Sequence, residues 1–304
     1  MSALVCAFPG QGSQFVGMGK ALYATDADVR ALYQTANDVL DYDLQKICFE
    51  GPEEELRLTQ HTQPAVLLHS IAVWTILRKR DVQPTLLAGH SLGEYSALVV
   101  SGALAFADAI RLVHLRGTFM QEAVPAGQGS MAAMLGVPRQ EVERLCTEFA
   151  ADGVLQAANY NAPGQIVIAG QSPAVQAAVK AVKTRRLGRS ILLKVSAPFH
   201  CALLQPAADR LAETLRQIKL QPFRLPVLSN VTAEPHPSPE ATKALLIDQV
   251  CDPVRWEDSM RYAVEQGCES FLEVGPGNIL SGMMRRIAPQ VNILKLDTLL
   301  GLKK

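Results

Sequence analysis

The chain has 304 residues, 48% of them hydrophobic, and its 29 basic and 29 acidic residues give a formal net charge of zero. This length and composition predict a large core in one big domain or two smaller ones, whereas zero net charge argues against a nucleic-acid-binding protein, whose affinity would depend on clustered positive charge. No apolar run is long enough to span a bilayer, and the N-terminus lacks the basic segment of a signal peptide.

The first predicted element is a buried strand at residues 3–8, followed by a glycine-rich loop at residues 9–14. The loop does not match a nucleotide-binding motif, because Phe15 occupies the place of a third glycine and Ala21 follows Gly19-Lys20 where magnesium binding requires Ser or Thr. It is either a plain turn or a loop whose backbone N–H groups face the same pocket as Ser91. Since loops at the carboxyl ends of parallel strands converge on one crevice, the second interpretation is reasonable.

Residues 20–80 are predicted to be mostly helical, and an apolar strand at residues 86–91 then leads into a Gly-x-Ser-x-Gly motif at residues 89–93. A small-residue helix follows the motif. Glycines on both sides of Ser91 allow a tight strand-to-helix turn, which exposes the hydroxyl above the sheet and places a helix N-terminus behind it. Ser91 is therefore the candidate nucleophile.

The helix predicted at residues 104–122 has one apolar half, and Arg116 falls inside it between Leu112 and Ala109. An inward guanidinium costs several kcal/mol unless it meets an anion. Either a buried Asp or Glu pairs with Arg116 or a ligand carboxylate does. The residues alone slightly favour the structural pair.

A Pro/Gly/Ser linker at residues 124–130 precedes the pattern strand, helix, strand, strand, helix, strand. That order is typical of a split β-α-β unit, an antiparallel sheet with two helices on one face. We therefore predict an α/β protein with a small inserted domain at residues 128–196 and a discontinuous large domain at residues 1–127 and 197–304. Further core strands of the large domain are predicted at residues 226–231 and 270–274.

His200 follows Pro198-Phe199 where the chain returns to the large domain, at the mouth of the predicted interdomain crevice. The other histidines lie on ordinary helices or in a proline-rich loop, and His90 would point away from its neighbour Ser91. His200 is therefore the best candidate for a general base. The six cysteines lie far apart without a Cys-x-x-Cys pair, so we expect reduced thiols in a cytoplasmic protein and no metal site.

The chain also resembles the malonyl-CoA:acyl carrier protein transacylases, the stand-alone acyltransferases of fatty acid synthesis, over essentially its whole length. The resemblance rests on Phe-Pro-Gly-Gln-Gly-Ser-Gln at residues 8–14, Gly-His-Ser-Leu-Gly-Glu at 89–94, Arg116, Asn-Tyr-Asn-Ala-Pro-Gly-Gln at 159–165, Pro-Phe-His at 198–200, Gln249 and Glu-Val-Gly-Pro-Gly at 273–277. The fold that it implies is a hydrolase-like α/β large domain with a parallel sheet and an inserted ferredoxin-like small domain, in agreement with the pattern above.

The resemblance implies a ping-pong transfer of the malonyl group from malonyl-CoA to the phosphopantetheine thiol of acyl carrier protein through a malonyl-serine. The residues that it implies are the nucleophile Ser91, the general base His200, Gln249 orienting His200 through its backbone carbonyl, the oxyanion-hole residues Gln11 and Leu92, and the substrate-binding residues Arg116, Phe199 and Asn161. Arg116 would hold the malonyl carboxylate, and the bulk of Phe199 suggests an unbranched malonyl group.

The expected partners are therefore malonyl-CoA and acyl carrier protein, with no cofactor, nucleic acid or membrane, and we expect a monomer. One rival is a serine hydrolase, which would need an acid between the serine and the histidine in chain order and no inward arginine. Another is a non-catalytic acyl- or carrier-binding protein, against which the intact Ser91, His200 and Arg116 argue. A transacylase for polyketide synthesis or malonate decarboxylase would share the site and differ in the carrier.

Overall fold

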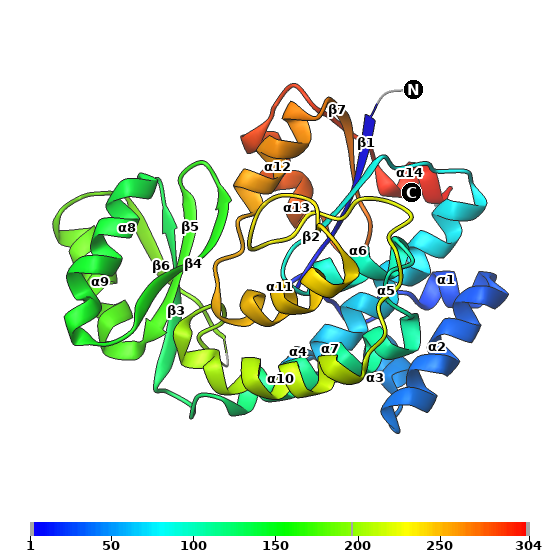
Figure 1. Cartoon of the computed structure of the whole chain (residues 1–304), viewed down its shortest axis with the longest axis horizontal. Coiled ribbons are helices and arrows are strands. Elements are labelled where there is room, and N and C mark those ends of the chain that lie inside the picture. The colour runs from blue at the N-terminus through cyan, green and yellow to red at the C-terminus, as the bar shows by residue number, and fades with distance from the viewer. Residues whose placement is uncertain (1–2, 196, 302–304) are drawn as a thin grey trace.

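The computed structural model describes residues 3–195 and 197–301, which form two separate four-stranded sheets (Figure 1). The N-terminal and C-terminal parts of the chain together build the first sheet, and the middle of the chain builds the second. The predicted end of the insertion at residue 196 lies outside the described residues.

The first sheet is parallel and has the strand order β2-β1-β7-β8. Its strands are β1 (Ala3–Phe8), β2 (Leu86–Gly89), β7 (Cys268–Glu273) and β8 (Asn292–Ile293). In β1 the side chains alternate between two cores: Cys6 and Phe8 face one, and Val5 and Ala7 face the other. Because both faces are covered, β1 is a continuous apolar run rather than an alternating one.

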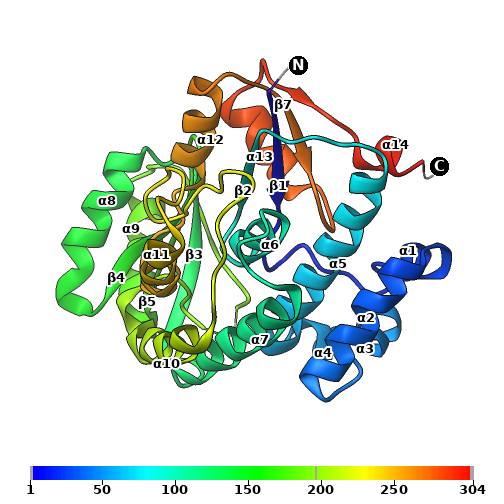
Figure 2. The same ribbon diagram turned by 45° about the vertical axis from the view of Figure 1, so that its right-hand side comes forward.

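Helices cover both faces of this sheet. Those that share the core of Cys6 and Phe8 are α1 (Lys20–Thr25), α2 (Ala27–Leu40), α3 (Leu44–Glu50), α4 (Glu53–Arg57), α5 (Thr59–Lys79), α6 (Leu92–Val100), α7 (Phe106–Glu122), α10 (Gln205–Gln217), α11 (Pro239–Cys251) and α14 (Leu296–Leu300). Those that share the core of Val5 and Ala7 are α12 (Trp256–Glu265) and α13 (Ile279–Ile287). Figure 2 shows α6 next to β1, with α5 and α7 packed beside it.

The second sheet is antiparallel and has the strand order β4-β5-β3-β6. Its elements in chain order are β3 (Gly129–Leu135), α8 (Arg139–Glu148), the 3₁₀ helix η1 (Phe149–Asp152), β4 (Leu155–Ala162), β5 (Gln165–Gln171), α9 (Ser172–Thr184) and β6 (Arg189–Leu192). The helices α8 and α9 pack on one face of this sheet. The predicted order of elements is therefore observed.

The other face of the second sheet packs against the returning chain. Met131, Ala158 and Ala169 form a small core with Cys201 and Phe199 there, just before the 3₁₀ helix η2 (Ala202–Leu204). A parallel bridge from Asn159 to Val254 and the Arg139–Asp258 ion pair at 3.1 Å join the second sheet to the region of α12. Phe199 and Cys201, the two neighbours of His200 in the chain, are thus packed against the second sheet.

One predicted strand is wrong. Residues 226–231 do not form a strand and make only isolated bridges, from Val227 to Leu87 of β2 and from Leu228 to Pro235. Pro226 has no N–H to extend a ladder, and the chain reverses within a few residues, where Ala233 adopts a left-handed φ of 62°. The segment therefore leaves the edge of β2 after one bridge.

Candidate active site

Ser91 stands in a strained turn between the end of β2 and the start of α6. Its φ of 51° and ψ of −107° lie outside the regions that a serine ordinarily occupies. A Cβ at Gly89 would approach the Gly93 carbonyl carbon to 1.9 Å, and a Cβ at Gly93 would approach the Phe8 carbonyl oxygen to 1.9 Å. The glycines of the motif are therefore required by close backbone approach, as the sequence predicts.

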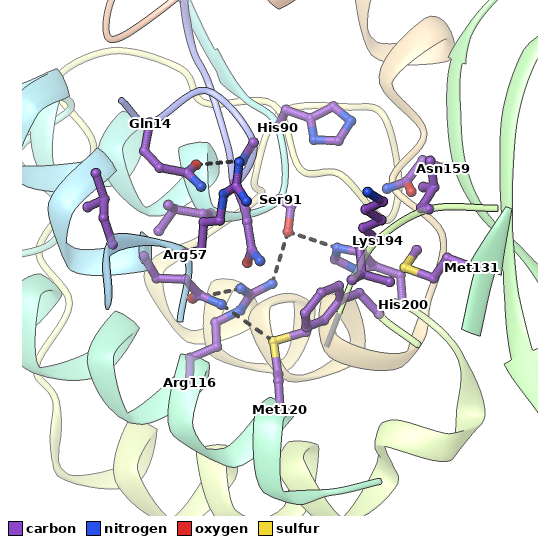
Figure 3. A pocket seen from close by; sticks show the side chains of 18 of the residues that line it. Gln14, Arg57, His90, Ser91, Arg116, Met120, Met131, Asn159, Lys194 and His200 are labelled. Atoms are coloured by element: carbon purple, nitrogen blue, oxygen red, sulfur yellow. Dashed lines mark hydrogen bonds between the residues drawn. The ribbon is translucent and has the colours of Figure 1, made fainter. Parts of the chain in front are cut away.

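A cavity of about 700 Å³ opens in front of Ser91. Gln11, Gly12 and Gln14 of the loop after β1 line it, which confirms that this loop faces the same pocket as the serine. The opposite wall comes from the second sheet and the segment that leaves it, through residues such as Met131 and Lys194 (Figure 3).

His200 is in direct contact with Ser91, and the Nε2–Oγ distance is 2.8 Å. On the other side of the ring, Nδ1 lies 2.7 Å from the backbone carbonyl oxygen of Gln249. Because a carbonyl oxygen only accepts hydrogen bonds, Nδ1 carries the proton and Nε2 is left as an acceptor for the serine hydroxyl. This is the tautomer of a general base.

The surroundings of His200 favour its neutral form. Burial and the nearby Arg116 charge lower the pKa of His200 from 6.5 to about 3, and the Gln249 carbonyl opposes this shift. The imidazole is therefore uncharged at neutral pH and able to take a proton.

Arg116 projects from α7 to the serine and is only 2% exposed. Its Nη2 donates to Ser91 Oγ at 3.1 Å and to Gln249 Oε1 at 2.9 Å. Its Nη1 donates to Gln63 Oε1 at 2.9 Å, and its Nε has no hydrogen-bond partner in the described part of the chain. These acceptors are neutral, and no Asp or Glu within residues 3–195 and 197–301 forms an ion pair with Arg116 at 4.0 Å or less. The structural ion pair left open by the sequence is therefore not formed.

Ser91 Oγ thus has two partners, as Figure 3 shows. The guanidinium donates to the oxygen, so the hydroxyl proton is free to point at His200 Nε2. The arrangement can pass a proton from serine to histidine beside a fixed positive charge.

The remaining site residues predicted from the sequence differ in how they are placed relative to the cavity. Gln11, Leu92 and Phe199 line the cavity, while Gln249 is buried behind it on α11. Asn161 is not among the described residues that line the cavity; its Oδ1 lies 2.8 Å from His90 Nε2. Any action of Asn161 on a substrate would therefore pass through His90.

Two residues that support the site were not anticipated from the sequence. Gln63 of α5 binds Arg116, and Asn230 accepts a hydrogen bond from the Ser91 backbone N–H at 2.6 Å while donating to the Gly89 carbonyl at 2.7 Å. Neither residue belongs to a recognisable motif, and Asn230 is 139 positions away from Ser91. The core strand predicted at residues 226–231 gave no sign of this role for Asn230.

Among the described residues, no group of three or more His, Cys, Asp or Glu side chains is arranged to hold a metal ion. In the same residues, no helix has the length and apolar character needed to cross a membrane.

Comparison with known proteins agrees with this geometry. A family model described as the acyl transferase domain matches residues 5–304. The malonyl CoA-acyl carrier protein transacylase of Bacillus subtilis is 44% identical over 288 residues, which cover 94% of this chain and 91% of that protein.

Two solved structures share the fold at similar identity. The malonyl CoA-acyl carrier protein transacylase of Coxiella burnetii superposes with a TM-score of 0.96 at 41% identity, covering 98% of this chain and 96% of that one. A malonyl-transacylase solved in complex with a type II PKS acyl-carrier protein gives a TM-score of 0.95 at 42% identity. The match covers 99% of this chain and 100% of that one.

Proposed function

Because the chain belongs to the malonyl CoA-acyl carrier protein transacylase family of acyltransferases, we propose that it transfers the malonyl group from malonyl-CoA to the phosphopantetheine thiol of an acyl carrier protein in fatty acid synthesis. The observation that carries this proposal is that one hydroxyl, Ser91 Oγ, contacts both a neutral histidine and a buried arginine. The histidine supplies a base for acyl transfer, and the arginine supplies a site for an acyl group that ends in a carboxylate.

The reaction has two halves with a malonyl-serine between them. In the first half, Ser91 Oγ attacks the thioester carbonyl as its proton moves to His200 Nε2. The tetrahedral intermediate then expels the coenzyme A thiolate, which takes the proton back from His200. In the second half, the carrier thiol gives its proton to His200 and attacks the malonyl-serine, and Ser91 recovers the proton as it leaves. Ping-pong kinetics follow.

The oxyanion of each tetrahedral intermediate needs hydrogen-bond donors that are already in place. Leu92 is the first residue of α6, so its N–H lies at the positive end of the helix dipole. Gln11 lines the cavity from the loop after β1. We propose the N–H groups of these two residues as the oxyanion hole.

The His200 ring is oriented by a backbone carbonyl in place of a carboxylate. The 2.7 Å contact from Nδ1 to the Gln249 carbonyl fixes the tautomer without placing a negative charge behind the ring. A serine hydrolase would have an acid there. This difference favours transfer chemistry with a weaker base over a hydrolase triad.

Arg116 is suited to a short diacid. In a malonyl thioester the carboxylate is only two carbon–carbon bonds from the reacting carbonyl, so its binding group must lie close to the nucleophile. The 3.1 Å distance between Arg116 Nη2 and Ser91 Oγ meets this requirement. We propose that the malonyl carboxylate binds the Arg116 guanidinium, that Phe199 limits branching at the acyl group, and that Asn161 supports substrate binding through His90.

Several further properties are part of the proposal. The strand order β4-β5-β3-β6, with α8 and α9 on one face, supports a ferredoxin-like small domain at residues 128–196 inserted into a hydrolase-like large domain at residues 1–127 and 197–304. The proposed reaction needs only the thioester and the carrier thiol, so we propose that the protein uses no cofactor. The monomeric state and the cytoplasmic location remain predictions from the sequence.

The experiment that tests the function follows malonyl-CoA in the presence of a phosphopantetheinylated acyl carrier protein or of water alone. We expect malonyl-carrier protein to form rapidly and free malonate to form slowly, with both products abolished in Ser91→Ala. Rapid release of malonate without transfer to the carrier would assign the protein to the hydrolases instead.

One observation favours a second candidate. The similar malonyl-transacylase described above was solved with a type II PKS acyl-carrier protein. The same site could therefore load a carrier outside fatty acid synthesis. A comparison of kcat/KM for the two kinds of carrier at fixed malonyl-CoA distinguishes the candidates, because only the carrier-dependent half-reaction differs between them.

A further inference from the structure

Glu94 is a carboxylate in the interior of the protein, three residues after the nucleophile on α6, and its side chain is 0% exposed. It accepts hydrogen bonds from the Gln249 side-chain Nε2 at 2.8 Å and from the Asn230 backbone N–H at 2.9 Å, both through Oε2. Its Oε1 accepts from His236 Nε2 at 2.8 Å. None of these contacts is explained by the transfer reaction itself.

The contact with Gln249 decides which way the carboxamide of Gln249 points. Glu94 Oε2 already accepts from the Asn230 N–H, and a guanidinium can only donate, so the amide NH₂ of Gln249 faces Glu94 and its oxygen faces Arg116. The same NH₂ donates to the Ser91 carbonyl at 3.1 Å. The amide oxygen is thereby left facing Arg116, whose Nη2 donates to it at 2.9 Å.

The opposite orientation of the amide would place its NH₂ against the guanidinium and its oxygen against the carboxylate. Both contacts would then be repulsive in a buried environment, where unpaired polar groups are costly. Gln249 is 0% exposed and cannot turn to water instead. Glu94 thus holds Gln249 in the one orientation that supports Arg116.

We propose that Glu94 is a positioning residue for acyl-group specificity, which acts through the Gln249 carboxamide to fix the Arg116 guanidinium beside Ser91. This inference rests on the proposed function, in which Arg116 binds the malonyl carboxylate. Glu94 does not line the cavity and touches no reacting atom. It acts on the acyl group only through Gln249 and Arg116.

The test uses two substitutions of similar size at position 94. Glu94→Leu removes the acceptor, whereas Glu94→Gln can keep its carbonyl oxygen on Gln249 and Asn230 and turn its NH₂ toward His236. That histidine can receive this donor, because its Nδ1 has no hydrogen-bond partner in the described residues and can carry the ring proton instead.

The readout is the ratio of kcat/KM for malonyl-CoA to kcat/KM for acetyl-CoA. In Glu94→Leu we expect this ratio to fall by about tenfold or more, the size expected when a hydrogen bond to a charged group is lost. In Glu94→Gln we expect it to return to within about threefold of the wild-type ratio. A loss of folded protein would lower both rates equally and would leave the ratio unchanged.

A matched control is Glu273→Leu, which removes another buried carboxylate far along the chain. Glu273 accepts from the backbone N–H groups of Leu280 and Ser281 at 3.1 and 2.8 Å and does not line the cavity. We expect Glu273→Leu to lower the melting temperature and leave the malonyl-to-acetyl ratio at the wild-type value.

A double-mutant cycle keeps the test decisive if Glu94→Leu folds poorly. Glu94→Asp, which shortens the side chain, is combined with Gln249→Met, which removes the carboxamide and keeps the backbone carbonyl. If Glu94 acts through Gln249, the double variant has the same ratio as Gln249→Met alone. Independent, additive losses, or an unchanged ratio in every Glu94 variant, would overturn the inference. Wild-type protein that transfers no malonyl group would instead overturn the proposed function.

Discussion

At Ser91, a single oxygen atom contacts both the proposed general base and the proposed binding group for the malonyl carboxylate. It donates its proton toward His200 and accepts a hydrogen bond from Arg116, at 2.8 and 3.1 Å. The positive charge beside the oxygen stabilises a developing alkoxide, and it also lowers the basicity of the neighbouring imidazole. In the proposed mechanism, activation of the nucleophile and selection of the substrate are therefore coupled through the same guanidinium.

Replacing Arg116 should separate these two effects. In Arg116→Ala we expect malonyl transfer to lose about 2 to 5 kcal/mol of transition-state stabilisation, because a desolvated charge partner is removed, while acetyl transfer is spared or improved. The measurement is kcat/KM for the two thioesters. Arg111→Ala is the matched control, since Arg111 lies on the exposed face of the same helix. Equal losses for the two acyl groups would contradict the role of Arg116.

The pH dependence of acylation provides a second test at this scale. With the pKa of His200 lowered to about 3 by burial and by Arg116, the base stays neutral far below pH 6.5. The acid limb of kcat/KM for acetyl-CoA, which reports the free enzyme, should therefore lie well below pH 6.5 and move upward in Arg116→Ala. An acid limb at the ordinary histidine value in the wild type would show that the buried environment does not control the base.

The sequence predicts the reacting residues better than the residues that hold them. Ser91 and His200 could be inferred because a glycine motif and a proline hinge mark their backbone, and Arg116 because its charge interrupts an apolar helix face. Gln63 and Asn230 carry no such local mark, and the motif that contains Glu94 does not show what its side chain contacts. Their partners lie 53, 139 and 155 positions away, so only the folded chain shows the contacts.

The element on which the site depends most is α6, because Ser91, the proposed nucleophile, stands at its N-terminus. The helix begins at Leu92, and the backbone of its second residue, Gly93, packs directly against the Phe8 carbonyl at the end of β1. A small side chain there would push the helix, and Ser91 with it, away from the sheet. The sequence thus predicts the strand before Ser91 and the helix after it, and the glycines of the motif also predict that the backbone packs closely at this turn.

Two glycine substitutions test this packing. In Gly93→Ala, whose Cβ would lie 1.9 Å from the Phe8 carbonyl oxygen, we expect a loss of stability of about 1 to 3 kcal/mol or more and a loss of acylation. In Gly282→Ala of α13, where a Cβ meets nothing within 4 Å, we expect a gain of about 0.5 to 1 kcal/mol and full activity. Chemical denaturation of both variants measures the difference. A well-folded, active Gly93→Ala would refute the close-packing argument.

Some elements outside the site were missed or wrongly predicted from the hydrophobic pattern of the sequence. The short strand β8 and the helix α14 were not predicted, and residues 226–231 were predicted as a strand that does not form. Apolar runs indicate burial reliably, but they do not show whether both edges of a segment find a partner. At residues 226–231 the backbone turns instead to bring Asn230 to Ser91.

For the whole molecule, buried histidines couple folding to pH. Burial lowers the pKa of His69 to about 4, that of His200 to about 3 and that of His90 below its ordinary value. Between pH 6.5 and about 3 these histidines therefore bind more protons in the unfolded chain than in the folded protein, so the stability that their neutral forms allow is present above pH 6.5 and is lost as the pH falls.

The substitution His69→Leu tests this coupling away from the active site. His69 lies on α5 and its Nδ1 has no hydrogen-bond partner in the described residues, so an apolar replacement leaves no donor or acceptor stranded. We expect the slope of unfolding free energy against pH between pH 6.5 and 4 to decrease by up to about 1.4 kcal/mol per pH unit, the value for one proton. Urea denaturation at several pH values gives the slope, and an unchanged slope would show that His69 is protonated in the folded state.

The central claim is that Ser91 carries the malonyl group between two thiols. Intact-mass analysis of the protein after incubation with malonyl-CoA tests it most directly. We expect one malonyl group per chain, located on Ser91, absent in Ser91→Ala and removed when a phosphopantetheinylated carrier protein is added. Turnover of malonyl-CoA without an adduct on the wild-type protein, or an adduct that persists in Ser91→Ala, would contradict it.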